Sequence, residues 1–157
     1  MYSITLLSIL CLVSAVMTYG LGIFVFAKNP VSRTNKIFLL VNLGASYWAI
    51  GEYLIWSQNS YENVWFWLKM SSFWTVVIVM CVHFILTYAD HPYSKPENRI
   101  FLIAILYIPA IILAALNIST ESIFTVAYES SRYFYAPALG NPVYQISTVY
   151  FLAVLLW

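Results

Sequence analysis

Residues 4–27 read ITLLSILCLVSAVMTYGLGIFVFA, a run of 24 positions without a charged side chain. A helix of about 20 mostly apolar residues is long enough to cross the hydrocarbon core of a bilayer. The apolar core of a secretory signal peptide is about half as long as this run, and residues 1–3 carry no basic side chain. We therefore interpret residues 4–27 as a permanent membrane-spanning helix.

The rest of the chain has the same character. Of its 157 residues, 62% are apolar and only 8% are charged, whereas soluble domains carry about 25% charged residues. So few charges cannot cover a soluble surface, and a net charge of +1 gives no field that would attract polyanions. The composition excludes a soluble enzyme, a disordered segment and a nucleic-acid partner. It indicates a multi-pass protein of the cell membrane, in contact with the lipid bilayer.

Four more apolar segments follow the first, so we predict an all-α, polytopic transmembrane helix bundle with five spans in a single domain over residues 1–157. The later spans cover residues 37–56, 64–88, 100–118 and 143–157. The last has 15 residues, about 22 Å of helix at about 1.5 Å per residue, against a core about 30 Å thick. We therefore expect this chain to be a fragment that is truncated inside its fifth span.

The basic side chains gather on one side of the predicted bundle. Five of the seven lie in the loops after spans one and three: Lys28, Arg33, Lys36, Lys95 and Arg99. The other two are Lys69, inside span three, and Arg132 on the opposite side. Short cytoplasmic loops carry the excess of Lys and Arg, so we expect the N-terminus to lie outside. The outer connection, residues 119–142, is rich in tyrosine, and we expect it to lie on the outer membrane surface or to fold over the bundle.

Two charged side chains, Glu52 and Lys69, fall inside predicted spans. Glu52 lies eight residues before Ser60, and Lys69 lies eight residues after Tyr61, on either side of the turn between spans two and three. Antiparallel neighbours that leave one turn would place both side chains at about the same depth. Charges in the bilayer are costly unless they pair or face a wet cavity, so we predict a Glu52–Lys69 ion pair.

Further polar residues extend this pattern along both helices. At about 100° per residue, Asn42 lies on the face of span two that carries Glu52, and Ser72 and His83 lie on the face of span three that carries Lys69. Small and polar stripes of this kind usually face other helices. Two interpretations stay open: the stripes hold the helices in register, or they line a polar cavity that binds a ligand or responds to protons.

The sequence contains no glycine-rich phosphate loop, no metal-ligand cluster and no nucleophile motif. We therefore assign no catalytic, cofactor-binding or metal-binding residue. We expect no cofactor, and no enzyme activity from this chain alone.

Five motifs in order along the chain resemble the N-terminal seven-helix region of prokaryotic sensor histidine kinases. They are NPVSRTNK at residues 29–36, WAIGE at 48–52, WLK at 67–69, HFILTY at 83–88 and YAPALGNPVY at 135–144. The resemblance extends from about Lys28 to Trp157, and Glu52 and Lys69 match polar positions of the family pattern. Spans six and seven and every output module of that family are absent from this chain.

The resemblance implies a sensory input module of a two-component signal transduction system. It would relay a small-molecule or membrane-borne signal of unknown identity to a cytoplasmic output domain in the same full-length chain, and such kinases usually act as homodimers. Two alternatives stay open. The chain could be a structural or accessory subunit of a membrane complex, or, ranked third, a transporter fragment, although no internal repeat supports the latter.

Overall fold

The computed structural model describes residues 2–129 and 131–156, so Trp157, the end of the fifth predicted span, lies outside the described residues. Most of the described chain is helical. The elements are α1 (Tyr2–Lys28), α2 (Arg33–Ser57), α3 (Tyr61–Met70), η1 (Ser71–Phe73), α4 (Trp74–Tyr88), η2 (Pro92–Ser94), η3 (Pro96–Asn98), α5 (Arg99–Ser119), β1 (Phe124–Glu129), β2 (Arg132–Pro137) and α6 (Pro142–Leu156).

Four helical stretches are long and apolar enough to cross a membrane. They are Leu6–Lys28, Arg33–Ser57, Tyr61–Tyr88 and Ile100–Ser119, which correspond to the first four predicted spans. The fifth predicted span is the shorter apolar helix α6, with 15 residues. A polytopic helical bundle therefore describes the chain, with one addition that the sequence analysis did not predict, a β-hairpin.

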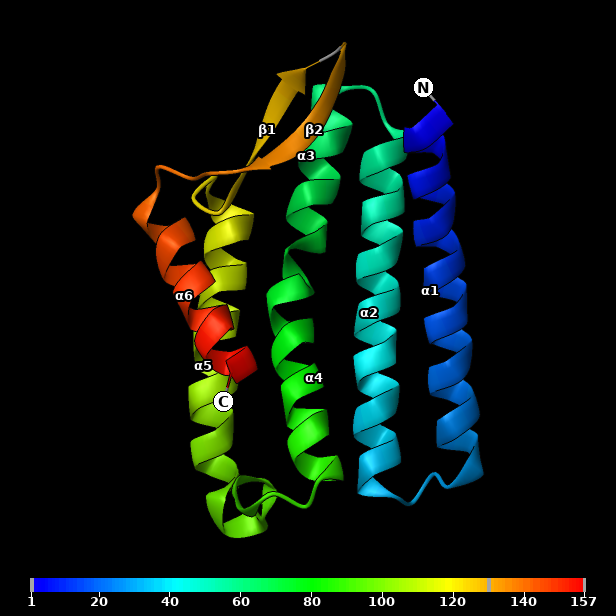
Figure 1. The fold of residues 1–157 in the computed structure, drawn as a ribbon, viewed down its shortest axis with the longest axis vertical. Helices are drawn as coiled ribbons and strands as arrows, with labels where there is room; N and C mark the ends of the chain where they lie inside the picture. The colour runs from blue at the N-terminus through cyan, green and yellow to red at the C-terminus, as the bar shows by residue number, and fades with distance from the viewer. Residues whose placement is uncertain (1, 130, 157) are drawn as a thin grey trace.

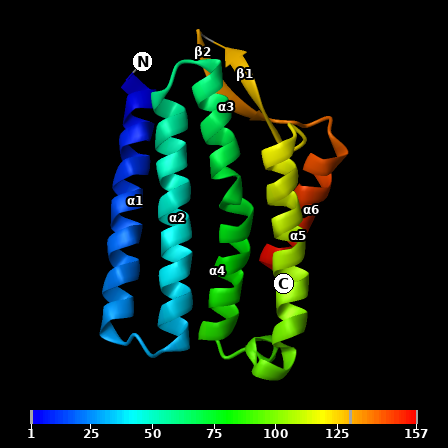
Figure 2. The ribbon, with the colours of Figure 1, turned by 180° about the vertical axis from the view of Figure 1, so that it is seen from behind.

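The long helices stand side by side and alternate in direction (Figure 1). Helix α1 packs on α2, α2 packs on α4, and α4 packs on α5. Seen from behind, the same row is evident, with α6 beside α5 and with the hairpin at the end of the bundle that carries the N-terminus (Figure 2). This end is called the hairpin end below.

The hairpin lies within the connection, residues 119–142, that we expected to lie on the outer membrane surface or to fold over the bundle. Its strands are antiparallel, with a register that runs from Phe124 opposite Pro137 to Glu129 opposite Arg132. Strand β1 combines aromatic and β-branched residues and β2 has three aromatic residues in a row, and both residue types favour extended structure. The hairpin covers α3 and the end of α2, because Phe124, Val126, Tyr133 and Tyr135 pack on a buried cluster of Ile55, Val64 and Leu68.

The third predicted span is broken near its middle by the short 3-10 helix η1. The hydroxyls of Ser71 and Ser72 donate hydrogen bonds back to the carbonyl oxygen of Leu68, at 3.2 and 3.1 Å. Serine side chains that bond to the preceding turn compete with the helical ladder and bend helices. The serine pair therefore explains why α3 and α4 are two helices.

The largest apolar core lies between α4, α5 and α6. Its α5 side contains Pro109, which has no N–H to donate to the carbonyl of Ile105. From α6, the Tyr150 hydroxyl lies 2.5 Å from the Leu106 carbonyl oxygen and 3.4 Å from that of Ile105. A side chain of α6 thus donates to the main chain of α5 at the turn that the proline weakens.

Candidate functional site

The polar face of the third span is directed at α5. Lys69 is only 6% exposed, and its Nζ donates to the carbonyl oxygen of Asn117 at 2.8 Å and to that of Thr120. The last carbonyls of a helix have no partner within the helix, and a lysine side chain can satisfy them. Lys69 therefore caps the C-terminal end of α5.

Three further contacts continue this face toward the other end of the bundle. Ser72 accepts a hydrogen bond of 2.7 Å from Asn117 Nδ2, and Thr75 donates one of 3.0 Å to the carbonyl of Ala110. His83 Nδ1 lies 2.9 Å from the Tyr107 hydroxyl. All these partners belong to α5, so the predicted stripe that contains Ser72 and His83 holds the third span against α5.

Asn42, on the second span, faces the opposite neighbour. It is buried, its Nδ2 donates to the Phe38 carbonyl at 2.8 Å, and its Cβ packs against Gly22 of α1. The hydroxyl of Ser46, one turn further along, donates to the Ala15 carbonyl of α1 at 2.8 Å. The part of the second stripe that contains Asn42 thus faces α1, whereas His83 has its ring partner on α5.

Glu52 has three hydrogen-bond donors, and all of them are aromatic side chains. Its Oε1 accepts from Trp48 Nε1 at 3.2 Å, and its Oε2 accepts from Trp56 Nε1 and from the Tyr135 hydroxyl, each at 3.1 Å. The two tryptophans lie one turn before and one turn after Glu52 on α2, and Tyr135 comes from β2. The carboxylate is therefore oriented by its own helix and by the hairpin.

In the described part of the chain, Glu52 and Lys69 do not form the predicted ion pair. Lys69 donates to α5 and Glu52 accepts from α2 and β2, so the two side chains have no partner in common. The physical reason is that α5 ends beside Lys69 and offers it unsatisfied carbonyl oxygens. The spacing on either side of the turn predicted that Glu52 and Lys69 lie at a similar depth, but it carried no information about the position of α5.

Tyr135 is held in its protonated, donating form. Burial raises the pKa of its phenol, and the charge of Glu52 together with the hydrogen bond to it raises the pKa further. Burial disfavours the charged form of an acid, and a neighbouring carboxylate disfavours a second negative charge. Tyr135 is therefore a neutral donor to Glu52.

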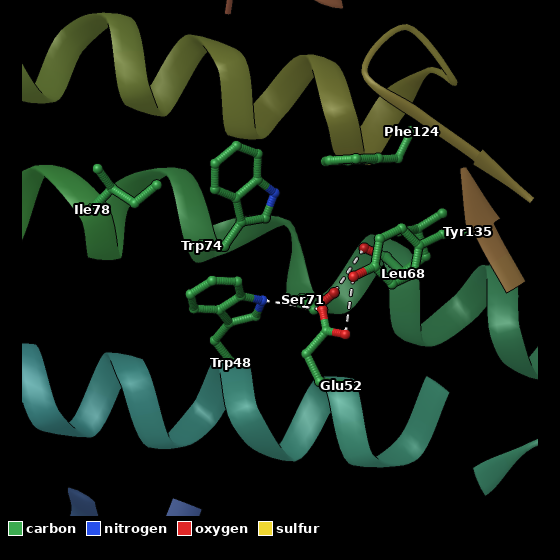
Figure 3. A pocket seen from close by; sticks show the side chains of 8 residues that line it. All are labelled: Trp48, Glu52, Leu68, Ser71, Trp74, Ile78, Phe124 and Tyr135. Carbon is green, nitrogen blue, oxygen red and sulfur yellow. Dashed lines mark hydrogen bonds between the residues drawn. The ribbon is translucent and has the colours of Figure 1, made fainter. Parts of the chain in front are cut away.

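Beside Glu52 lies a cavity of about 180 Å³. Figure 3 shows the side chains that line it, which come from α2, α3, η1, α4 and the hairpin. They are Trp48, Glu52, Leu68, Ser71, Trp74, Ile78, Phe124 and Tyr135. The cavity thus lies at the break of the third span, under the hairpin.

Four of the lining residues form a continuous series of ring contacts that we call the aromatic arc: Trp48, Trp74, Phe124 and Tyr135. Neighbouring ring centroids in the series are 6.5, 5.9 and 5.4 Å apart. Both ends of the aromatic arc donate hydrogen bonds to Glu52. The carboxylate and the four rings therefore border the same space.

The sequence analysis gave none of the aromatic arc a role in a site. Trp48 had a usable signal, since it lies four residues before Glu52 and so on the same face of α2. Phe124 and Tyr135 had none, because they reach the cavity only through the pairing of β1 with β2.

The fold and this site define a multi-pass membrane protein with a small cavity near one end of its bundle. Residues 10–157 match the family described as the N-terminal 7TM region of histidine kinase, and the chain belongs to this family. This finding confirms the resemblance drawn from the five motifs. No curated protein and no solved structure matches the chain.

Proposed function

We propose that this chain is the sensory input region of a membrane histidine kinase and that it relays a signal to a cytoplasmic output domain in the same full-length chain. Membership of the N-terminal 7TM family of histidine kinases carries this proposal. The family region is an input region, so the proposal assigns no catalytic residue to these 157 residues. A homodimer is the assembly that we propose for the full-length kinase.

The proposed topology has five spans, with α6 as the fifth and with the N-terminus outside. Its support is the distribution of charge between the two ends of the bundle. Two basic side chains, Lys69 and Arg132, belong to the hairpin end, whereas the five others lie in or beside the α1–α2 and α4–α5 connections at the opposite end. The positive-inside rule places the end with the larger number of basic residues in the cytoplasm.

The proposed relay starts at the cavity. A ligand changes a conformational equilibrium only when it binds one arrangement more tightly than the other. The cavity contacts both sides of the η1 break, through Leu68 on α3 and through Trp74 and Ile78 on α4. Helix α4 runs from this break to the end of the bundle opposite the hairpin (Figure 1). A change in the angle at η1 would therefore move the cytoplasmic end of the third span.

The test uses the full-length protein in inverted membrane vesicles with labelled ATP. We expect acid-labile phosphohistidine on the protein and, in the reading frame, a histidine-containing dimerisation helix followed by an ATP-binding domain. Full-length protein without phosphohistidine, purified with a stoichiometric membrane partner, would instead support the accessory subunit. Cysteine labelling from outside at Glu129→Cys, but not at Lys36→Cys, is expected from the proposed orientation.

A further inference from the structure

The carboxylate beside the cavity has no cationic partner among the described residues, although two basic side chains lie at the same end of the bundle. Lys69 donates to carbonyl oxygens of α5. Arg132 donates to the carbonyl oxygens of Trp56 and Gln58, at 2.8 and 3.1 Å, and so caps α2. A carboxylate at membrane depth is costly unless a positive charge or hydrogen bonds compensate it.

The three donors to Glu52 do not balance its charge. Two are indole N–H groups and one is a phenol, so each is neutral. Its Oε2 accepts two hydrogen bonds and its Oε1 accepts only one. An ionised carboxyl group has about four acceptor sites, so Oε1 keeps the capacity to accept from a ligand in the cavity that it lines.

The rest of the wall is suited to a cation with an apolar surface. The aromatic arc supplies four of the eight lining residues, and Leu68 and Ile78 supply aliphatic surface. A cation that lies within about 6 Å of an aromatic ring is attracted by the quadrupole of that ring, and aromatic cages with this chemistry recognise quaternary ammonium groups.

We propose that this cavity binds a small organic cation of the alkylammonium class, with its charge against Glu52 and its alkyl groups against the aromatic arc. The volume of about 180 Å³ is below the ~300–1,000 Å³ of pockets for drug-sized ligands, so the ligand is compact.

A metal ion fits this cavity less well. Hard cations such as Ca²⁺ take six to eight oxygen ligands, whereas the lining offers the Glu52 carboxylate and the hydroxyls of Ser71 and Tyr135. Within residues 2–129 and 131–156, no group of three His, Cys, Asp or Glu side chains could hold a metal ion.

The charge of the hairpin end favours the same ligand. The side chains of this end include four carboxylates, Glu52, Glu62, Glu121 and Glu129, and two basic groups, Lys69 and Arg132, so their summed side-chain charge is −2. A negative local field raises the concentration of cations near a site.

The binding site does not depend on the output of the full-length protein. The role of the cation as the signal, in contrast, rests on the proposed sensory function. A binding measurement therefore tests the site alone, and phosphohistidine formation tests the function, so the failure of either can be told from the failure of the other.

The test is thermal unfolding of the full-length protein in lipid nanodiscs, with choline chloride as the probe. The neutral isostere 3,3-dimethyl-1-butanol, which has carbon in place of the charged nitrogen, and sodium chloride at equal ionic strength are the controls. We expect saturating choline to raise the melting temperature by about 2–4 °C and both controls to leave it unchanged.

Two variants with matched controls locate the effect. Glu52→Gln keeps the size of the side chain and one acceptor oxygen, but it replaces the other oxygen with an NH2 group and removes the charge, and we expect it to weaken choline binding about tenfold or more. Its control is Glu121→Gln, a carboxylate of the same end that does not line the cavity. Trp74→Leu removes one ring of the aromatic arc, and its control is the exposed neighbour change Phe73→Leu.

The outcomes separate the alternatives. Equal stabilisation by the neutral isostere would show an apolar cavity only, and equal stabilisation by sodium would show a site for inorganic cations. Either result overturns the proposal, as does unchanged choline binding in Glu52→Gln. If Glu52→Gln does not fold, the comparison of choline with its neutral isostere on the unchanged protein tests whether binding depends on charge. Weaker choline binding in Trp74→Leu than in Phe73→Leu then tests whether choline binds in this cavity.

Discussion

The hydroxyl of Tyr135 donates a hydrogen bond of 3.1 Å to the carboxylate of Glu52 and so joins the β-hairpin to helix α2. Of the three donors to this carboxylate, it is the one that comes from another element of the fold. Together with Arg132, which donates to carbonyls at the end of α2, it fixes the hairpin over the cavity. If the cavity binds a ligand as proposed, we expect its occupation to be coupled to the position of the hairpin through Glu52.

We expect Tyr135→Phe to lower the free energy of unfolding by about 1.5–3 kcal/mol, since the lost hydrogen bond is to a charged group. Reversible unfolding by SDS in mixed micelles measures this loss. Tyr128→Phe is the control, because Tyr128 is an exposed residue of the same hairpin whose hydroxyl has no hydrogen bond among the described residues.

We expect the free energies of unfolding of the unchanged protein and of Tyr135→Phe to become more similar at alkaline pH. The raised pKa of Tyr135 means that the folded protein holds the phenol proton more tightly than the unfolded chain does. This contribution is fully present below about pH 10, the usual pKa of tyrosine, and is lost as the pH rises toward the folded-state pKa. A difference between the unchanged protein and Tyr135→Phe that stays constant from pH 7 to pH 11 would contradict the prediction.

The separate partners of Glu52 and Lys69 predict additive effects of their removal. We expect Lys69→Met to cost about 1–3 kcal/mol, because it leaves carbonyl oxygens at the end of α5 without a donor. In a double-mutant cycle with Glu52→Gln, the coupling energy should stay below about 0.5 kcal/mol. A coupling above about 1 kcal/mol would mean that the two charges interact directly in solution.

The sequence was sufficient to predict the four long helices and which residues are polar within them, because apolar length and charge are local properties. It predicted that Glu52 and Lys69 lie inside spans two and three. It could not predict their partners, since these depend on where α5 ends and on how Arg132 and Tyr135 are brought to α2. Those contacts join residues 48 to 83 positions apart in the chain.

The break at η1 and the hairpin could have been predicted from the sequence, because each has a local sequence signal. The pair Ser71 and Ser72 in an otherwise apolar run is a recognised cause of helix bending. The run FTVAYE at residues 124–129 combines aromatic and β-branched residues, and the run RYFYAP at residues 132–137 is aromatic. Two residues separate the runs, which is typical of a hairpin. Neither signal was used in the sequence analysis. The serine pair lies inside a predicted span, and the two runs lie in a connection that was expected to lie on the membrane surface or to fold over the bundle.

The contact between α6 and α5 can be tested at Tyr150. We expect Tyr150→Phe to cost about 1 kcal/mol, since its hydroxyl donates to the main chain of α5 near Pro109. The control Tyr144→Phe changes a tyrosine of the same helix whose hydroxyl has no hydrogen bond in the described part of the chain. An equal loss in SDS unfolding for both variants would mean that ring packing, and not the hydroxyl, holds α6.

Helix α2 approaches the η1 break closely at Gly51, next to Glu52 in the chain. A Cβ at Gly51 would lie 2.8 Å from the Cβ of Ser71, so we expect Gly51→Ala to cost about 1–3 kcal/mol through overpacking. Gly20→Ala on α1 is the matched control, because nothing lies within 4 Å of its added Cβ and alanine is favoured over glycine in helices by roughly 0.5–1 kcal/mol.

Since Ser71 lines the cavity, the shift at residue 51 should also weaken choline binding, whereas Gly20→Ala should leave it unchanged. Equal melting temperatures and equal choline affinities for the two variants would show that α2 and the break are not in firm contact, and the coupling of the cavity to the third span would then fail.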